Sequence, residues 1–153
     1  MSHPSKIDFL VRARDAGYFV TVYFICVSEP EINIRRVENR VSLGGHDVPR
    51  ERISPRYWRS LALLPAAIAV ADRAVLFDNS TLQVQSNDRN FPNVKGGLRP
   101  VAEVLRKGSH YQITLEANVP EWVATHLLRP LAELEATVEK VEVLVHQKDV
   151  PLG

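Results

Sequence analysis

Residues 18–31 read Y-F-V-T-V-Y-F-I-C-V-S-E-P-E, and they give the clearest indication of the fold class. Its first ten residues are rich in β-branched and aromatic side chains and are apolar on both faces, which is typical of a buried parallel strand. Ser28 and Glu31 then form a capping-box pattern with Pro30 in the first turn, so we expect a helix to begin there. A buried strand that leads directly into a helix indicates α/β order.

The neighbouring segments continue this alternation of helices and strands. Helical spacing predicts a helix over residues 4–16, ended by Gly17, and another after the first strand. A further helix is expected to break at Pro55, with Ser54 capping a new one. A short buried strand is expected over residues 74–77. The order helix, strand, helix, helix, strand predicts a parallel sheet with flanking helices.

The second half of the chain gives weaker signals. Residues 87–97 are polar and predict a loop, residues 99–107 predict a short helix, and residues 111–116 predict a strand. A last helix is expected to open at Pro120, with apolar residues over 127–145 spaced alternately four and three apart, as in a heptad seam. The end of that seam also alternates as a strand would, so both interpretations stay open.

The composition is that of one ordinary globular domain. The chain has 153 residues, of which 45% are hydrophobic and 24% charged, with a formal net charge of +1. Cys26 is the only cysteine, which excludes an internal disulfide, and the first residues do not resemble a signal peptide. The longest apolar run is too short to cross a bilayer as a helix. These features predict a cytoplasmic protein that does not bind membranes, and no spacing of ligand residues suggests a metal site.

Basic charge is concentrated between Arg35 and Leu61. Arginines stand there at positions 35, 36, 40, 50, 52, 56 and 59, and Gly44-Gly45-His46 interrupts the run. Arginine binds phosphate through a rigid fork of donors, so we interpret the two arginine-bearing helical segments, joined by a glycine hinge, as a phosphate lid. The alternative is a set of solvated arginines paired with Glu38 or Glu51. Nucleic-acid binding is not expected, because aromatic residues are not interleaved with the arginines.

The same ordered pattern resembles the zeta-toxin family of P-loop kinases. The resemblance is carried by Arg36-Val37, Arg40-Val41, Gly44-Gly45-His46, Val48-Pro49, Ile53, Arg56-Tyr57, Arg59-Ser60-Leu61, Ala71-Asp72 and Asp78-Asn79-Ser80. It implies an α/β fold of the P-loop NTPase type, a partial parallel sheet with flanking helices plus a C-terminal extension. Residues 1–80 would be the C-terminal part of the kinase core with its arginine lid, and residues 81–153 would be the extension, packed on the same domain.

The resemblance also implies an activity and a site. Such a kinase transfers a phosphoryl group from ATP, with Mg²⁺, to a hydroxyl of a small molecule such as a nucleotide sugar, and an antitoxin is a possible partner. The arginines expected to contact the phosphates are Arg36, Arg40, Arg56 and Arg59, and the residues expected near the nucleotide are Asp78, Asn79 and Ser80. The sequence contains no G-x-x-x-x-G-K-[ST] loop, so we expect the chain alone to be inactive and to hold no ATP tightly. The DNA upstream is expected to encode that loop in frame.

A second interpretation is a non-catalytic remnant of this fold that acts as an interaction or oligomerisation protein. The seam at 127–145 would then bind a partner helix or a second copy. Without a P-loop strand beside them, the strands at 18–27 and 74–77 would have an exposed apolar edge, so we expect self-association or a partner that covers it. In this interpretation Asp78-Asn79-Ser80 is a plain turn at the end of a strand.

Overall fold

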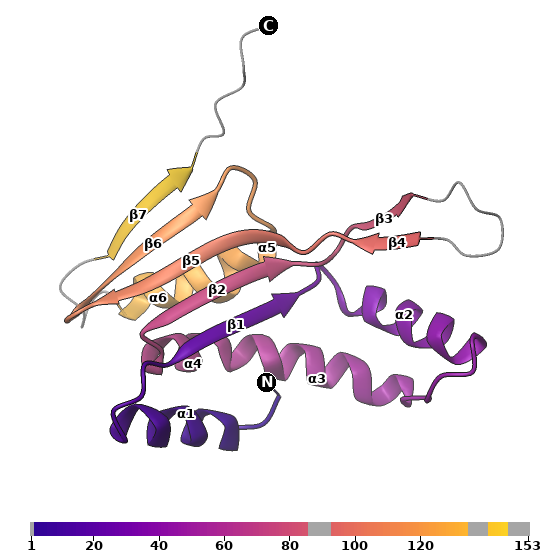
Figure 1. Cartoon of the computed structure of the whole chain (residues 1–153), viewed down its shortest axis with the longest axis horizontal. Helices are drawn as coiled ribbons and strands as arrows, with labels where there is room; N and C mark the ends of the chain where they lie inside the picture. Colours follow the sequence, from indigo (N-terminus) through magenta and orange to yellow (C-terminus); the bar gives the residue numbers. More distant parts are fainter. Residues whose placement is uncertain (1, 86–92, 135–140, 147–153) are drawn as a thin grey trace, which may run out of the picture.

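The computed structural model describes residues 2–85, 93–134 and 141–146 as an α/β fold (Figure 1). Its helices are α1 (Ser5–Asp15), α2 (Pro30–Ser42), α3 (Arg50–Ala62), α4 (Leu64–Val70), α5 (Glu121–Val123) and α6 (Arg129–Leu134), the last two joined by a π-helical turn, η1 (Ala124–Leu128). Its strands are β1 (Thr21–Cys26), β2 (Arg73–Asp78), β3 (Leu82–Gln85), β4 (Asn93–Gly96), β5 (Arg99–Lys107), β6 (His110–Glu116) and β7 (Val141–His146).

The main sheet is mixed. Its strand order is β1-β2-β5-β6-β7, and β3 and β4 form a separate antiparallel ribbon that projects from one end (Figure 1). β1 with β2 and β6 with β7 are parallel pairs, whereas β5 is antiparallel to both of its neighbours. The predicted α/β class is therefore confirmed, but the parallel order holds only for the two outer pairs.

Helices cover one face of this sheet, and that face contains the core. Burial alternates strictly along β6, where Tyr111, Ile113 and Leu115 are buried and the residues between them are half-exposed. On β1 the same alternation buries Val22, Phe24 and Cys26 on the helical side. Tyr23 and Ile25 are 64% and 54% exposed, so the prediction that this strand is buried on both faces is wrong. The reason is that β1 lies at the edge of the sheet and helices pack on only one side of it.

Two predicted helix boundaries are also wrong. α3 runs unbroken through Pro55, and Ser54 lies inside it. Pro55 has no N–H to donate to the carbonyl of Glu51, so the helix lacks one hydrogen bond. Pro55 and Glu51 are both exposed, so water can bond to that carbonyl. Buried Tyr57 and Leu61 hold the helix against the core. The capping box predicted from Ser28 and Glu31 is the second error, because the N-cap residue of α2 is Glu29 and no side chain caps the helix.

The segment predicted as a short helix at 99–107 is the central strand β5. It pairs with β2 on one side and β6 on the other, and these contacts override the helix propensity of its alanine, leucine, glutamate and lysine residues. Gly108, with φ +65°, begins a two-residue hairpin turn to β6 instead of ending a helix. The strand predicted at 111–116 is confirmed as β6.

The heptad seam is wrong as well. The helical segment ends at Leu134, and residues 141–146 form β7, which confirms the strand alternative. Of the loop predicted at 87–97, residues 93–96 form β4, and residues 86–92 lie outside the described part of the chain. Within the described ranges, no helix is both long and apolar enough to span a bilayer.

Candidate functional site

A cavity of about 690 Å³ lies where β1 leads into the α2–α3 hairpin. β1 and the residue after it line the cavity from Val22 to Val27, and Asn79, just beyond the end of β2, lines it beside them. α2 contributes Asn33, Arg36, Val37 and Arg40, and α3 contributes Ile53, Arg56, Tyr57 and Ser60, with Ser2 and Val48 completing the lining. Three of the four arginines proposed from the sequence therefore meet in one cavity.

Helical periodicity explains why these side chains share the cavity. The lining residues of α2 follow the spacing i, i+3, i+4, i+7, and those of α3 follow the same spacing. Residues so spaced lie on one face of a helix, so each helix presents one stripe to the space between them. Asn33 and Ser60 belong to these stripes, and their spacing from the arginines is the sequence signal that identifies them.

Arg36 is the most enclosed of the three arginines. Its Nη2 donates a hydrogen bond of 2.5 Å to the carbonyl of Asn79, which ties α2 to the end of β2. Its Nε is buried and has no hydrogen-bond partner among the described residues. A buried donor without a partner costs free energy, and a guanidinium has further donors that remain available to an anion.

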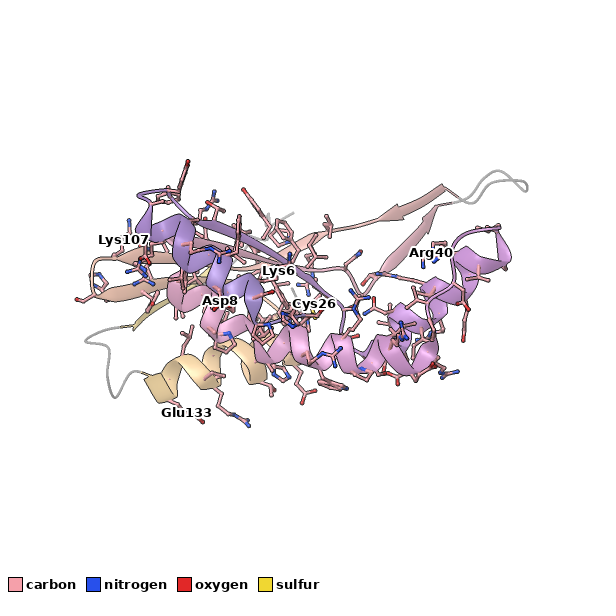
Figure 2. The ribbon with its side chains drawn as sticks, turned by 90° about the horizontal axis from the view of Figure 1, so that it is seen from below. Lys6, Asp8, Cys26, Arg40, Lys107 and Glu133 are labelled. Carbon is pink, nitrogen blue, oxygen red and sulfur yellow. The ribbon has the colours of Figure 1, made fainter. Side chains whose placement is uncertain are left out.

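Arg40 is held by the turn that joins α2 and α3. Its Nη2 donates to the carbonyl of His46 at 2.8 Å, and its own carbonyl accepts from the backbone N–H of Gly45 at 2.9 Å. A Cβ atom at Gly45 would lie 2.5 Å from Cγ of Arg40, so only glycine allows this close approach. Figure 2 shows Arg40 near the outer end of the hairpin, away from Cys26. The glycine pair therefore positions an arginine as well as ending a helix.

All charged residues that line the cavity are arginines. Arg56 is exposed, and its lining neighbours include no aspartate or glutamate. Within the described residues, no carboxylate oxygen lies within 4.0 Å of a guanidinium nitrogen of Arg36, Arg40 or Arg56. The arginines of this region that do pair lie outside the cavity lining: Arg35 with Glu29 at 3.5 Å, and Arg50 with Glu38 at 3.8 Å. The arrangement can bind an anion and offers no set of metal ligands.

One wall of the cavity is a buried Tyr57–Cys26 pair. The Tyr57 hydroxyl donates to the carbonyl of Val27 at 3.0 Å and lies 3.2 Å from that of Ser28, which fixes the chain where β1 ends. Burial raises the pKa of the Cys26 thiol from 9.0 to about 11, and burial also raises the pKa of Tyr57. Both side chains are therefore neutral at physiological pH and have a structural role.

This raised thiol pKa predicts a loss of stability at alkaline pH. Below pH 9.0 Cys26 is protonated in both states and its contribution is fully present. Between pH 9.0 and about 11 the unfolded thiol ionises and the folded one does not, so stability falls by at most about 3 kcal/mol. Urea unfolding of the parent and of Cys26→Ala from pH 8 to about pH 11 tests this. Both proteins contain Tyr57, so its ionisation affects both curves alike. The Ala variant should therefore lose less stability than the parent between pH 9 and about 11, and parallel curves would contradict this prediction.

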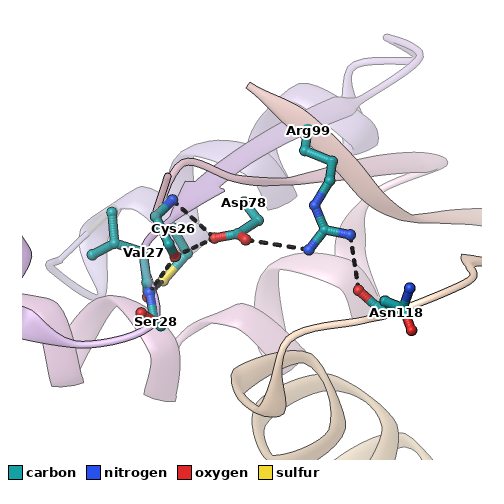
Figure 3. A network of polar contacts seen from close by, with 7 residues as sticks. Cys26, Val27, Ser28, Asp78, Arg99 and Asn118 are labelled. Atoms are coloured by element: carbon teal, nitrogen blue, oxygen red, sulfur yellow. Dashed lines mark hydrogen bonds and ion pairs between the residues drawn. The ribbon is translucent and has the colours of Figure 1, made fainter. Parts of the chain in front are cut away.

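Asp78 and Ser80, on either side of Asn79 in the sequence, are engaged in a structural network. Figure 3 shows Asp78 in this network with Ser28 and Arg99. Oδ1 of Asp78 accepts hydrogen bonds from the backbone N–H of Ser80, at 3.1 Å, and from its hydroxyl, while Oδ2 lies 3.3 Å from Nη2 of Arg99. Ser80 Oγ accepts from the N–H of Ser28 at 2.7 Å. Of the three residues proposed to lie near a nucleotide, only Asn79 lines the cavity, and Arg59 does not line it.

Comparison with known proteins gives one local match. The chain is 32% identical over 57 residues to an uncharacterized protein of Haemophilus influenzae (strain ATCC 51907 / DSM 11121 / KW20 / Rd), and the match covers 37% of this chain and 41% of that protein. The matched part is thus about two fifths of the relative's length. No family model matches the chain, and no solved structure matches it. The zeta-toxin resemblance therefore stays a prediction.

Proposed function

We propose that the cavity binds a phosphoryl or polyphosphate group through Arg36, Arg40 and Arg56. The observation that carries this proposal is the convergence on one cavity of three arginines that have no carboxylate partner in the described part of the chain. Arginine forks match phosphate oxygens in geometry and charge, and Arg36 bonds the carbonyl of Asn79 through Nη2 alone, so its guanidinium has further N–H donors. Asn33 and Ser60 add neutral polar groups between the two helices that would contact the rest of such a ligand.

The sequence resemblance extends this proposal to a reaction. The chain would be the arginine-bearing part of a P-loop kinase of the zeta-toxin type, which transfers phosphate from Mg-ATP to a hydroxyl of a small molecule such as a nucleotide sugar. Arg36, Arg40 and Arg56 would stabilise the charge of the transferred group, and Asn79 would lie near the nucleotide. Arg59, Asp78 and Ser80 have no ligand contact in this proposal, because they lie outside the cavity lining. The sequence has no Walker A loop, so we expect this chain alone to hold no ATP tightly.

Calorimetric titration with tripolyphosphate tests the anion site in the chain as it stands. We expect weak binding at low ionic strength, with a dissociation constant on the order of 1 mM, that weakens further when salt is added. Arg36→Gln should weaken it by about tenfold or more, because each hydrogen bond to a charged group contributes about 1.5–3 kcal/mol.

Arg35→Gln is the matched control for this experiment. Arg35 is the neighbouring residue on α2, is exposed, and pairs with Glu29 outside the cavity, so this change removes the same charge without touching the site. Equal losses in the two variants would mean that tripolyphosphate responds only to net charge, and the proposed site would be wrong.

A further inference from the structure

The cavity also borders an unpaired strand edge. β1 pairs with β2 alone among the described strands: the carbonyl of Cys26 accepts from the N–H of Asn79 at 2.7 Å, and that of Val20 accepts from Arg73 at 3.2 Å. Backbone groups alternate in direction along a strand, so the N–H and C=O groups of Thr21, Tyr23 and Ile25 point away from β2. Since Tyr23 and Ile25 line the cavity, these backbone groups border it.

This edge has none of the features that usually protect the edge of a sheet. β1 reads T-V-Y-F-I-C, without a charged residue or a proline, and its pairing with β2 is regular over all six residues. Natural edge strands carry charges, prolines or bulges, because an open row of donors and acceptors pairs readily with another extended chain. An unprotected edge inside a lined cavity is therefore a ready template for β-augmentation.

The positive charge of the cavity favours an acidic segment as the chain that pairs with this edge. Arg36 binds the carbonyl of Asn79, and the N–H of Asn79 binds the carbonyl of Cys26, so the cationic end of the cavity is the carboxyl end of β1. An extended segment that pairs with β1 would bring its side chains at that end next to Arg36, Arg40 and Arg56. Acidic side chains there would neutralise cations that have no carboxylate partner among the described residues.

We infer that the β1 edge docks an extended acidic polypeptide segment, whose main chain extends the sheet and whose carboxylates bind the cavity arginines. This inference rests on the anion site proposed above and adds the backbone edge as a second determinant. Such a segment and a phosphate ligand would exclude one another from the arginines, so a partner of this chemistry would act as an inhibitor of phosphate binding.

A second copy of the chain is a poorer occupant of the same edge. β1 of another copy is uncharged, so a symmetric antiparallel pairing of two β1 strands would leave the arginines of both cavities without anions. An extended segment rich in aspartate or glutamate would pair with the backbone of β1 and also supply carboxylates to the arginines.

Fluorescence anisotropy with the full chain and labelled synthetic peptides tests the inference. The probes are TVTVTDD and DDTVTVT, which place an acidic pair at either end of a strand-forming core, and TVTVTNN and NNTVTVT as neutral controls. We expect one acidic orientation to bind about tenfold or more tightly than its neutral control, and tripolyphosphate to displace it. Arg36→Gln should abolish this preference for acid, whereas Arg35→Gln should preserve it.

The backbone contribution is measured separately from charge. In the better peptide, the N–H groups of alternate core residues point to the same edge of the strand. N-methylation of the set that faces β1 should abolish binding, and N-methylation of the other set should have little effect. In the protein, Ile25→Pro removes an N–H that points away from β2, so it should weaken binding without breaking the β1–β2 ladder. Its circular dichroism and its cooperative thermal unfolding serve as checks that it folds.

Three results would overturn the inference. If both N-methylation patterns leave affinity unchanged, the peptides bind the arginines only as polyanions. If no acidic peptide binds while tripolyphosphate still does, the edge is not a docking site and the phosphate proposal stands alone. If the chain is a dimer in light scattering and Ile25→Pro dissociates it, the occupant of the edge is a second copy.

Discussion

Replacing Trp122 by alanine is expected to lower the free energy of unfolding by about 3–5 kcal/mol. Trp122 lies on α5, is 4% exposed, and its ring centroid is 6.0 Å from that of Phe24 on β1. This contact joins the C-terminal helical segment to the strand that borders the cavity. Removal of so large a buried side chain leaves a cavity that the core cannot refill. Thermal unfolding should show a loss of roughly 10 °C in Tm or more for a chain of this size.

Trp122→Phe is the informative control. Nε1 of Trp122 is buried and has no hydrogen-bond partner among the described residues, so its removal deletes a desolvated donor while a ring still packs against Phe24. We expect Phe to cost less than about 1.5 kcal/mol. A Phe variant as unstable as the Ala variant would show that a single packed ring does not stabilise this position and that the full indole is required.

The second large effect is expected from Asp78→Ala, at about 3 kcal/mol of unfolding free energy. The carboxylate is buried, and it accepts two hydrogen bonds from Ser80 and pairs with Arg99. Alanine would leave the Ser80 hydroxyl and the Arg99 guanidinium without this partner in a partly buried site. Urea unfolding at neutral pH measures the loss.

Arg99→Gln should cost much less than Asp78→Ala. Its side chain is 46% exposed, so solvent screens the ion pair and can solvate the substituted residue. Ser80 also accepts from the N–H of Ser28, so Asp78→Ala should loosen the end of β1 and weaken tripolyphosphate binding as well. Equal stability losses in the two variants would mean that the ion pair, and not the Ser80 hydrogen bonds, is the main contribution of Asp78.

The N-terminal half of the fold could be predicted from the sequence because its signals are local. The helix expected at 4–16 is α1, and Gly17 follows it with φ +84°. The apolar run at 18–27 contains β1, and the strand expected at 74–77 is the core of β2. Helical spacing identifies α1, and short apolar runs identify β1 and β2, although only one face of β1 is buried. Pro55 misled the prediction because its cost in isolation is outweighed by the packing of α3.

The C-terminal half depended on contacts between distant residues. β5 consists largely of helix-forming residues and is a strand because it fills the gap between β2 and β6. One local signal was available: Gly108-Ser109 separates two apolar runs by two residues, which is a hairpin pattern. No comparable signal distinguishes the end of the helix at Leu134 from a continued heptad seam.

For the candidate site, the residue types were predicted and their arrangement was not. Arginine spacing within α2 placed Arg36 and Arg40 on one face, and the structure adds Arg56 from α3 to the same cavity. The exclusion of Arg59 follows from its position on α3, three residues after Arg56 but off the stripe formed by Ile53, Tyr57 and Ser60. The exposed edge expected at residues 18–27 is confirmed, because β1 pairs only with β2 among the described strands. The exposed edge expected at residues 74–77 is wrong, because β5 pairs with β2 there, and that pairing depends on the strand order of the whole sheet.

The insertion of β5 between β2 and β6 also sets an order of events during synthesis. β2 ends at Asp78, and its second neighbour is complete only when Lys107 has left the ribosome. At about 5–20 residues per second, the interval is roughly 1.5–6 seconds. During that time the nascent β1–β2 pair carries two unpaired edges, and its apolar face lacks the helical segment that contains Trp122. The newly made chain is therefore a stronger client for chaperones than the finished protein, in which β5 closes one of those edges.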